Sequence, residues 1–225
     1  MTPNHGGKKM WVIPKITLDF IERMLDVLEV YERPYDPKFP VVCVDEKSKQ
    51  LLKEVRNWLR MKPGKPKRQD YEYERNGTVN MFVAVEPRGG KRAVRVTKHR
   101  RKRDWAFFIR YLVDVVYKDA EKIILVEDNL NTHNEQTLID VFGEKTGKRI
   151  GSKIEWHFTP EHASWLNQAE IEIHSFETQV LKKRIGTFQK MQSEIAACVR
   201  YRNQKYCMIN WQFTRNKAIT KFHLN

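Results

Sequence analysis

Two short apolar segments that end in acidic residues constrain the fold of this chain more than any other feature. Residues 40–46 read Pro-Val-Val-Cys-Val-Asp-Glu, and residues 123–128 read Ile-Ile-Leu-Val-Glu-Asp. Such brief apolar runs are typical of strands that are buried on both faces, inside a sheet that helices cover. In open α/β sheets, ligands collect at the carboxyl ends of the strands. The two segments therefore predict a sheet edge that carries several carboxylates.

Clustered carboxylates are suited to a divalent cation, because Mg²⁺ prefers oxygen ligands. Asp45 and Asp128 are the candidate ligands at the ends of the two strands. A third acid is expected on a neighbouring helix, where Glu170 is the best-placed candidate. The alternative for Asp128 is that it only caps the helix that follows, since Asp and Asn are favoured at N-caps.

The charge balance predicts a polyanionic partner. The chain has 225 residues, enough for one large domain or for one domain with an appendage. Lys and Arg number 42 against 28 Asp and Glu, which gives a formal net charge of +14. Nucleic acid is the commonest partner of a protein this basic. The alternative is a basic protein that does not act on nucleic acid.

Cysteine usage and hydropathy predict a soluble protein of a reducing compartment. Cys43, Cys198 and Cys207 form no closely spaced pair and no zinc-binding pattern, so we expect them to be small core residues. No apolar run approaches the roughly 20 residues that span a bilayer, and the first residues show no apolar signal region.

Hydrophobic periodicity and turn residues predict the order of the helices and strands. Strands are expected over residues 41–44, 78–85, 93–97, 123–126 and 153–158, and helices over residues 18–31, 104–117, 134–142, 165–184 and 189–203. Thr17 and Asp104 are the expected caps of the first two helices. Residues 46–60 show no clear preference for helix or strand, and residues 61–68 are expected to form a basic loop. Glycines at 143, 147 and 151 mark another loop, and the tail can hold one more short helix.

The order of these elements predicts an α/β fold with a mixed sheet. Residues 87–90, Pro-Arg-Gly-Gly, indicate a hairpin and therefore an antiparallel pair of strands. The later alternation of strands and helices indicates parallel crossover connections. A mixed sheet with helices on both faces accommodates both kinds of connection.

Three acidic motifs of the chain resemble those of the DDE transposases. The motifs are residues 42–46 (Val-Cys-Val-Asp-Glu), 127–133 (Glu-Asp-Asn-Leu-Asn-Thr-His) and 164–170 (Ser-Trp-Leu-Asn-Gln-Ala-Glu). They look closest to the bacterial insertion-sequence transposases related to Tc and mariner elements, the family numbered 630. The similarity extends through residues 61–66 and the hairpin. It implies a ribonuclease-H-like fold with a mixed five-stranded sheet, in which the acids lie on the first strand, after the fourth strand and on a later helix.

The resemblance implies that Asp45, Asp128 and Glu170 bind two Mg²⁺ or Mn²⁺ ions about 3.5–4 Å apart. Such a site would cleave DNA phosphodiesters at transposon ends and would transfer the 3′-hydroxyl into target DNA, without a covalent protein–DNA intermediate. The implied partners are double-stranded DNA, both transposon ends and target, and a second copy of the chain in a homodimer. The implied location is the bacterial cytoplasm, in association with the nucleoid.

Each of these acids has an acidic neighbour that is a rival for its role: Glu46, Glu127 and Glu172. Alternation along a strand sends Glu46 to the face opposite Asp45. Glu172 lies about 200° around the helix from Glu170. One member of each pair can therefore face the site, and the family motif favours Asp45, Asp128 and Glu170.

Several cationic runs are candidates for phosphate contacts, although any such run can also be a solvated face. The candidate DNA-binding residues are Lys65, Lys67, Arg68, Arg100, Arg101, Arg103, His133, Lys182, Lys183 and Arg184. His133 and Asn131, like His162 and His174, could contact a phosphate or orient a carboxylate, or they could be structural. Trp58 and Trp165 could stack on exposed bases, or they could pack in the protein.

The sequence departs from the family in its N-terminal part. Relatives carry two helix-turn-helix modules that recognise transposon ends, whereas about 40 residues with one helix precede the first catalytic strand here. We therefore expect a second product of a split or frameshifted gene, an excised catalytic domain or a decayed copy. The expected parts are an N-terminal linker with one helix (1–38), a ribonuclease-H-like DDE catalytic domain (39–205) and a C-terminal tail (206–225).

Two other functions compete with the transposase reading. The first is a truncated or domesticated DNA-binding protein without cleavage activity, and the presence of all three acids counts against it. The second is a glycoside hydrolase that uses two acids. The strong positive charge and the lack of an aromatic-rich sugar cleft motif count against the second function.

Overall fold

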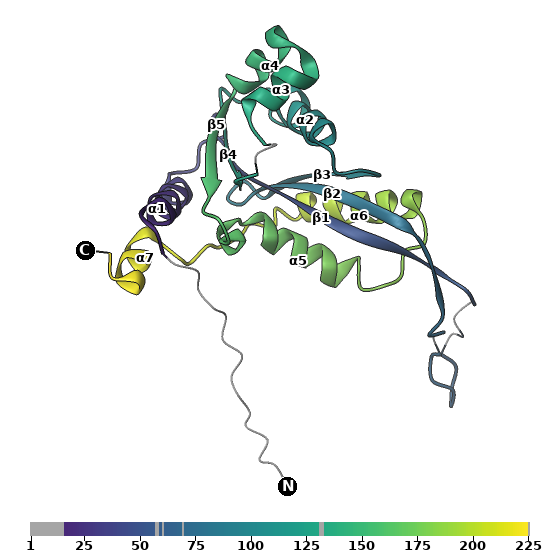
Figure 1. The fold of residues 1–225 in the computed structure, drawn as a ribbon. Coiled ribbons are helices and arrows are strands. Elements are labelled where there is room, and N and C mark those ends of the chain that lie inside the picture. The colour runs from purple at the N-terminus through teal and green to yellow at the C-terminus, as the bar shows by residue number, and fades with distance from the viewer. Residues whose placement is uncertain (1–15, 57–58, 60, 69, 131–132, 225) are drawn as a thin grey trace.

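A mixed five-stranded sheet lies at the centre of the structure, a computed structural model that describes residues 16–224 except 57, 58, 60, 69, 131 and 132 (Figure 1). The strands are β1 (Val41–Glu54), β2 (Tyr73–Glu86), β3 (Lys91–Thr97), β4 (Ile123–Asp128) and β5 (Ile154–Thr159). Their spatial order is β3-β2-β1-β4-β5. The pairs β1–β2 and β2–β3 are antiparallel, and the pairs β1–β4 and β4–β5 are parallel. The predicted mixed sheet is confirmed.

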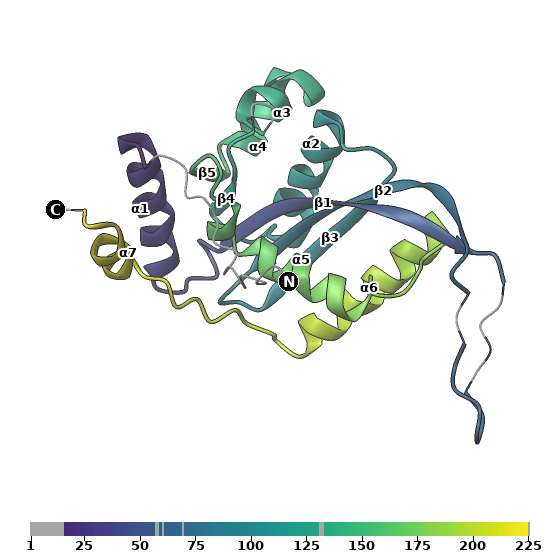
Figure 2. The ribbon, with the colours of Figure 1, turned by 60° about the horizontal axis from the view of Figure 1, so that its bottom comes forward.

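Helices cover both faces of this sheet, as predicted (Figure 2). They are α1 (Leu18–Glu32), α2 (Lys102–Tyr111), α3 (Glu135–Phe142), α4 (Glu144–Gly151), α5 (Ala169–Gln179), α6 (Phe188–Gln204) and α7 (Arg215–Phe222). A π-helical turn (η1, Leu112–Val116) follows α2, and a 3-10 turn (η2, Ser164–Leu166) precedes α5. In Figure 1, α2, α3 and α4 lie above the sheet, while α5 and α6 lie below it.

Alternation along the central strands divides the buried side chains between the two faces. Val42 and Val44 of β1 belong to the core beneath α2, α3 and α4. Cys43 belongs to the core under α1, and Met81 of β2 belongs to the core under α5 and α6. The apolar parts of the central strands are therefore buried on both sides, which explains their continuous apolar runs.

Strand β1 is much longer than predicted, because it continues beyond Val44 to Glu54. Its second half is polar, with Lys47 opposite Met81 and Lys49 opposite Val79. The ladder with the apolar strand β2 holds these lysines in a strand that their own propensity does not favour. Figure 1 shows that β1 and β2 extend together beyond the helices as an arm. The predicted basic loop lies at the end of this arm, where Lys62 bridges to Lys65.

Helix α2 begins earlier than predicted, and its cap differs. The predicted cap, Asp104, lies inside the helix, and its carboxylate accepts a hydrogen bond from the backbone N–H of Arg101 at 3.0 Å. Asp104 therefore satisfies an N–H of the first turn by reaching back, as the third residue of a capping box does. The last predicted turn is the π-helical segment η1, which carries the chain from α2 towards β4.

Two further helix predictions are wrong. The glycine-marked loop after α3 is helix α4, because Gly143 with φ of 81° ends α3 and Gly147 allows α4 to contact α3 closely. The long helix predicted to reach residue 184 ends at Gln179. Beyond it the chain turns into the core, and the carbonyl of Ile185 accepts a hydrogen bond from Leu52 of β1 at 2.9 Å. This backbone bond to the sheet replaces the helical continuation.

Both ends of the described chain lie on one side of the sheet. Thr17 caps α1 as predicted, with its hydroxyl accepting from the N–H of Phe20 at 3.1 Å. Helix α7 is the predicted short helix of the tail, and it lies beside α1 (Figure 2). The division at residues 38 and 206 stays a prediction. Among the described residues, no helix is both long and apolar enough to cross a membrane.

We predict that Gly147→Ala destabilises the protein by about 1–3 kcal/mol, as overpacking typically does. A Cβ at this position would lie 2.5 Å from the Cα of Ile139 in α3, so the two helices would have to separate. Urea unfolding would measure the change in the free energy of unfolding. Lys145→Ala, on the exposed face of the same helix, is the matched control and should leave stability unchanged. Equal effects of the two substitutions would contradict the packing argument.

Candidate active site

The parallel pair β1–β4 brings the first two predicted acids together. Cys43 of β1 is the register partner of Val126 of β4, and each predicted acid lies two residues further along its strand. Asp45 and Asp128 therefore lie beside each other and point to the same face of the sheet. Asp128 accepts a hydrogen bond from the hydroxyl of Thr159, the last residue of β5, at 2.9 Å. The sheet thus fixes both backbones, and β5 orients one carboxylate.

Asn167 attaches the third predicted acid to the same strand. Its buried side-chain amide donates to the carbonyl of Val44 at 2.8 Å, immediately before Asp45 in β1. Its side-chain oxygen accepts from the N–H of Ala169 at 3.1 Å, and its carbonyl accepts from the N–H of Glu170 at 3.1 Å. The start of α5, which carries Glu170, is therefore held against the strand that carries Asp45.

The three carboxylates interact electrostatically. The pKa of Asp45 is raised from 3.8 to about 7, mainly by burial and also by the nearby charges of Asp128 and Glu170, against the lowering effect of the hydrogen bond from the Glu46 N–H. The pKa of Glu170 is raised mainly by burial and also by Asp128, while Lys47 lowers it. Like charges at short range disfavour ionisation, and a cation between them would relieve this cost. The structure therefore brings together the three acids that the sequence singles out.

The rival on α5 has a structural role. Glu172 is fully buried and forms an ion pair with Arg92 of β3 at 2.8 Å. Arg202 of α6 binds both oxygens of the same carboxylate, at 2.8 and 2.9 Å. With two cations occupying it, Glu172 joins α5, α6 and β3, and it points away from the site of Glu170.

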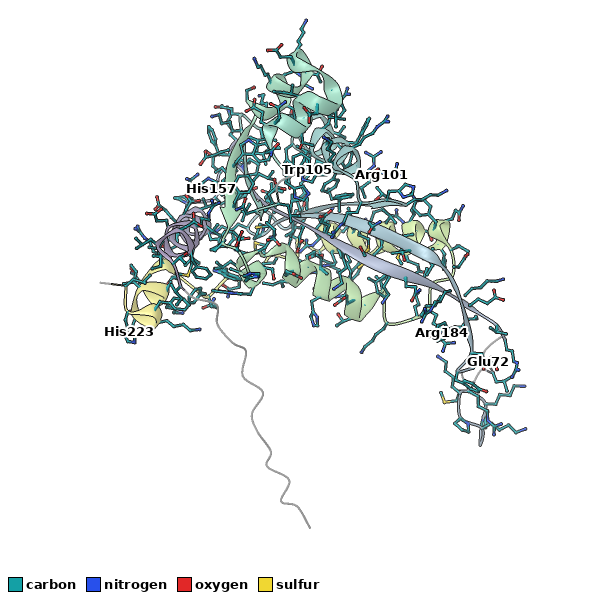
Figure 3. The ribbon with its side chains drawn as sticks, in the orientation of Figure 1. Glu72, Arg101, Trp105, His157, Arg184 and His223 are labelled. Carbon is teal, nitrogen blue, oxygen red and sulfur yellow. The ribbon has the colours of Figure 1, made fainter. Side chains whose placement is uncertain are left out.

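The other two rivals lie together on the opposite face of the sheet. Glu127 is 1% exposed and accepts a hydrogen bond from the indole of Trp105 at 3.1 Å, beneath α2 (Figure 3). Glu46 lies 3.8 Å from His133, and His133 lies 3.6 Å from Glu127. Burial raises the pKa of Glu127 well above its ordinary value. The predicted separation of Glu46 from Asp45 onto opposite faces of the sheet is thus found in the structure, and Glu127 is separated from Asp128 in the same way.

His133 stacks on Trp105, with ring centroids 4.9 Å apart, and is 6% exposed. Burial, and secondarily the charge of Arg100, lowers its pKa to about 4. A neutral, buried imidazole on this face is placed to orient Glu46 and Glu127 rather than to contact a phosphate. Its neighbour Asn131 lies outside the described residues.

A hollow of about 400 Å³ adjoins Asp128, between the end of β4 and the loop after β5. Thr159 and Ser164 supply hydroxyls to its lining, and Glu161 and His162 supply charged or ionisable groups. His162 has a φ of 60°, a left-handed conformation that is uncommon for a residue other than glycine. Polar groups and a strained backbone next to a candidate catalytic acid are typical of a substrate-contacting loop.

The cationic candidates are distributed over three regions. Lys65, Lys67 and Arg68 lie on the arm, and Arg100, Arg101 and Arg103 surround the start of α2 on the surface (Figure 3). Lys182 and Lys183 are exposed after α5, and Lys183 pairs with Glu194.

Arg184 is partly buried and serves the structure. Its guanidinium binds Glu54 at 2.9 Å and the carbonyls of Glu72 and Tyr71 at the base of the arm (Figure 3). Of the remaining residues raised by the sequence, His174 is exposed on α5, and Trp165 is 46% exposed and packs edge-on against Phe213. Trp58 lies outside the described residues.

Sequence reasoning missed the residues that position the acids. Asn167 and Thr159 were not singled out, although Asn167 lies within the third acidic motif, three residues before Glu170. A buried Asn beside a helix start is a detectable signal only when the strand it binds is known. The threonine gives no signal in the sequence, because a Thr that ends a strand is ordinary.

The described side chains do not form a ready-made metal site. In the part of the chain that the structure describes, no three His, Cys, Asp or Glu side chains are arranged closely enough to hold a metal ion. The donor set is nevertheless suitable, since all three acids offer oxygen ligands and their charges repel one another.

The sheet order, the mixed pairing and the acids on the neighbouring strands β1 and β4 define a ribonuclease-H-like fold. Residues 40–192, more than half of the chain, match the family described as DDE superfamily endonuclease. The chain belongs to this family. Among curated proteins, no sequence matches it.

Solved structures of the mariner transposase Mos1 have a similar fold. The Mos1 paired-end complex with Mn has a TM-score of 0.57 and 14% identity, over 92% of this chain and 62% of that chain. The Mos1 strand transfer complex has a TM-score of 0.59 and 14% identity, over 91% of this chain and 61% of that chain. The chain thus spans about three fifths of the length of these proteins. At this identity the likeness concerns the fold.

We predict that the stability of the metal-free protein falls as pH rises from about 4 to about 7 because of Asp45. Its folded pKa of about 7 lies above its ordinary value, so the folded state keeps a proton that the unfolded chain has already lost in this window. Asp45→Asn should remove about 1–3 kcal/mol of this pH dependence. Urea unfolding in chelator across the window measures it, and parallel curves for the two proteins would contradict the assignment.

We also predict that Glu172→Ala costs about 3–5 kcal/mol in the free energy of unfolding, because it leaves two arginines without their buried partner. Glu170→Ala on the same helix is the matched control. It should cost less than about 1 kcal/mol, since it removes a half-buried charge that its neighbours repel. If Glu170→Ala were the more destabilising of the two in chemical denaturation, the assigned roles would have to be exchanged.

Proposed function

We propose that this chain is the catalytic domain of a DDE transposase. It would cut DNA phosphodiesters at transposon ends and join the resulting 3′-hydroxyl to target DNA. The observation that carries the proposal is that a chain of the DDE endonuclease family has Asp45 beside Asp128 on paired strands, with the start of the helix that carries Glu170 held against β1 by Asn167. The fold shared with Mos1, whose complexes contain paired ends and a strand-transfer state, supports the same reaction.

Asp45, Asp128 and Glu170 are the residues that would hold the metal, and we propose a pair of Mg²⁺ or Mn²⁺ ions. Bound divalent ions activate an attacking water or hydroxyl and stabilise the leaving oxygen in phosphoryl transfer. The Mos1 paired-end complex was solved with Mn, which supports a divalent ion in this fold. The chain itself contributes oxygen ligands on a rigid sheet edge, with Thr159 orienting Asp128 and Asn167 fixing the start of α5.

Double-stranded DNA is the proposed partner, and the charge of the chain supports it. Arg100, Arg101 and Arg103 form an exposed group at the start of α2, and the arm offers Lys65 and Lys67. Phosphate contacts from such residues would position the duplex without reading its sequence. The loop that carries His162 would then contact the strand nearest Asp128.

Three finer features of the proposal come from the family resemblance. They are a homodimer that pairs two transposon ends, membership of the bacterial insertion-sequence branch, and a location with the nucleoid in the cytoplasm. The second candidate function is DNA binding without cleavage. The observation in its favour is that the three acids do not form a closed ligand set in this conformation, within the described residues.

We predict Mg²⁺- or Mn²⁺-dependent nicking of supercoiled plasmid, with rate losses of at least about a hundredfold for Asp45→Asn, Asp128→Asn and Glu170→Gln. Each substitution removes one proposed ligand while keeping the size of the side chain. Gel electrophoresis of nicked and supercoiled forms measures the rate. Glu46→Gln, the neighbour of Asp45 on the opposite face, is the matched control and should retain activity within about tenfold.

The same proteins separate the two candidate functions. Duplex binding in a gel shift should survive Asp128→Asn, because phosphate contacts come from other residues. A wild-type chain that binds duplex DNA but never nicks it would favour the second function. A chain in which Glu46→Gln is as inactive as Asp45→Asn would refute the assignment of the acids.

A further inference from the structure

Strand β3 forms one edge of the sheet, since it pairs with β2 alone. At the start of β3, the side chain of Asn203 makes the hydrogen bonds that a further strand would make on the unpaired side of β3. The N–H of Arg92 donates to the side-chain oxygen of Asn203 at 2.8 Å, and the side-chain amide of Asn203 donates to the carbonyl of Arg92 at 3.0 Å. Asn203 of α6 thus takes the place of a neighbouring strand for one residue.

The bonds to Asn203 fix the direction of every other backbone group in β3. Alternate residues of a strand direct their N–H and C=O to the same side. Because those of Arg92 face outwards, those of Val94 and Val96 also face outwards. Within the described residues, no side chain bonds to Val94 or Val96 as Asn203 does to Arg92. An edge of this kind is a template for pairing with another chain.

A groove of about 670 Å³ runs along this part of β3, and we call it the β3 groove. Its floor is the strand from Arg92 to Lys98. One wall is a stripe of α6 at helical spacing, formed by Gln192, Ile195, Ala196, Val199, Arg200 and Asn203. Tyr111 of α2, which is 38% exposed, lines the other side. From Val94 to Thr97 the strand is about 13 Å long, the length of a four-residue extended peptide.

The charges of the β3 groove have one sign. Arg95, Lys98 and Arg200 are exposed in its lining, and the lining contains no acidic residue. Arg92 is a fourth cation, but its guanidinium is buried against Glu172. No ion pair is found for Arg95 or Arg200 among the described residues. Apolar surface from Val94, Ala196 and Val199 lies between these charges.

We propose that the β3 groove binds an extended acidic segment of a partner protein, which adds to the sheet as a sixth strand beside β3. Its backbone would pair with the outward groups of Val94 and Val96. Side chains on the α2 face of the new strand would be acidic, opposite Arg95, and the alternate side chains on the α6 face would be small and apolar, over Ala196 and Val199, with Arg200 adding positive charge beside them. The groove would give the catalytic domain a docking site for another protein, separate from the carboxylates on β1 and β4.

The chemistry of the edge disfavours two other occupants. Nucleic-acid phosphates only accept hydrogen bonds, so they cannot satisfy the outward carbonyls of Val94 and Val96. A second copy that pairs through its own β3 would place like charges opposite each other, because residues 91–97 contain three cations and no acid. An acidic peptide satisfies both the backbone and the charges.

The test uses the full chain and a fluorescent peptide of alternating glutamate and valine, with fluorescence anisotropy as the readout. The peptide should bind, and a peptide of alternating lysine and valine should not. Two N-methylated versions of the acidic peptide then test the backbone hydrogen bonds to β3. One version has every odd-numbered backbone amide methylated, and the other has every even-numbered one methylated. The version whose methylated amides face β3 should bind at least about tenfold more weakly than the unmethylated peptide, whereas the other version should bind with unchanged affinity.

A charge-reversed double variant tests the walls of the groove. Arg95→Glu with Arg200→Glu should weaken peptide binding about tenfold or more. Arg75→Glu with Lys118→Glu makes the same change in net charge at exposed sites elsewhere, and it should leave the affinity unchanged. Circular dichroism and thermal unfolding establish that each variant is folded.

The proposal is overturned if the acidic peptide fails to bind at about 1 mM, or if both methylated versions bind equally well. It is equally overturned if the control variant loses as much affinity as the groove variant. Loss of duplex DNA binding in the groove variant, without peptide binding to the wild type, would identify the groove as a DNA surface. A wild-type dimer in sedimentation that Val94→Pro dissociates would identify it as a self-association surface. All of these results are independent of the nicking assay, so the failure of one proposal does not decide the other.

Discussion

The parallel pairing of β1 with β4 is the constraint on which the rest of the candidate site depends. It sets the register in which Asp45, within β1, and Asp128, at the end of β4, lie beside each other on two strands whose apolar parts are buried on both faces. Burial first, and the like charges of Asp128 and Glu170 second, disfavour ionisation of Asp45 and raise its pKa. The cores on either side of the sheet must therefore stabilise the fold against the repulsion that the site creates.

The sheet also separates acids of different roles that are neighbours in the sequence. On one face, Asp45 and Asp128 are half-buried, and Asp128 lines a hollow beside β4. On the other, Glu46 and Glu127 are enclosed with His133 and Trp105 under α2. Alternation along two strands thus places a second layer of titratable groups directly behind the first. On α5 the helical period has the same effect, because it turns Glu172 into the core and leaves Glu170 at the site.

The sequence was sufficient to predict the sheet and most helices, because these depend on local periodicity. A motif singled out the three acids, and their metal-binding role stays a prediction. The predictions failed where distant contacts decide the structure. The polar half of β1 is a strand only because β2 pairs with it, and α5 ends at Gln179 because Ile185 bonds to Leu52. The positioning roles of Asn167 and Thr159 depend on which strands are neighbours in space. No single segment of the sequence contains that information.

The buried contact of Arg184 has a mechanical consequence. Its guanidinium binds Glu54 of β1 and the carbonyls that lead into β2, while its backbone belongs to the segment that follows α5. The base of the arm and the end of the helix that carries Glu170 therefore share one anchor. A force that bends the arm would be transmitted to this helix as tension. A ligand that binds to the arm, far from the sheet, would therefore shift the carboxylate of Glu170.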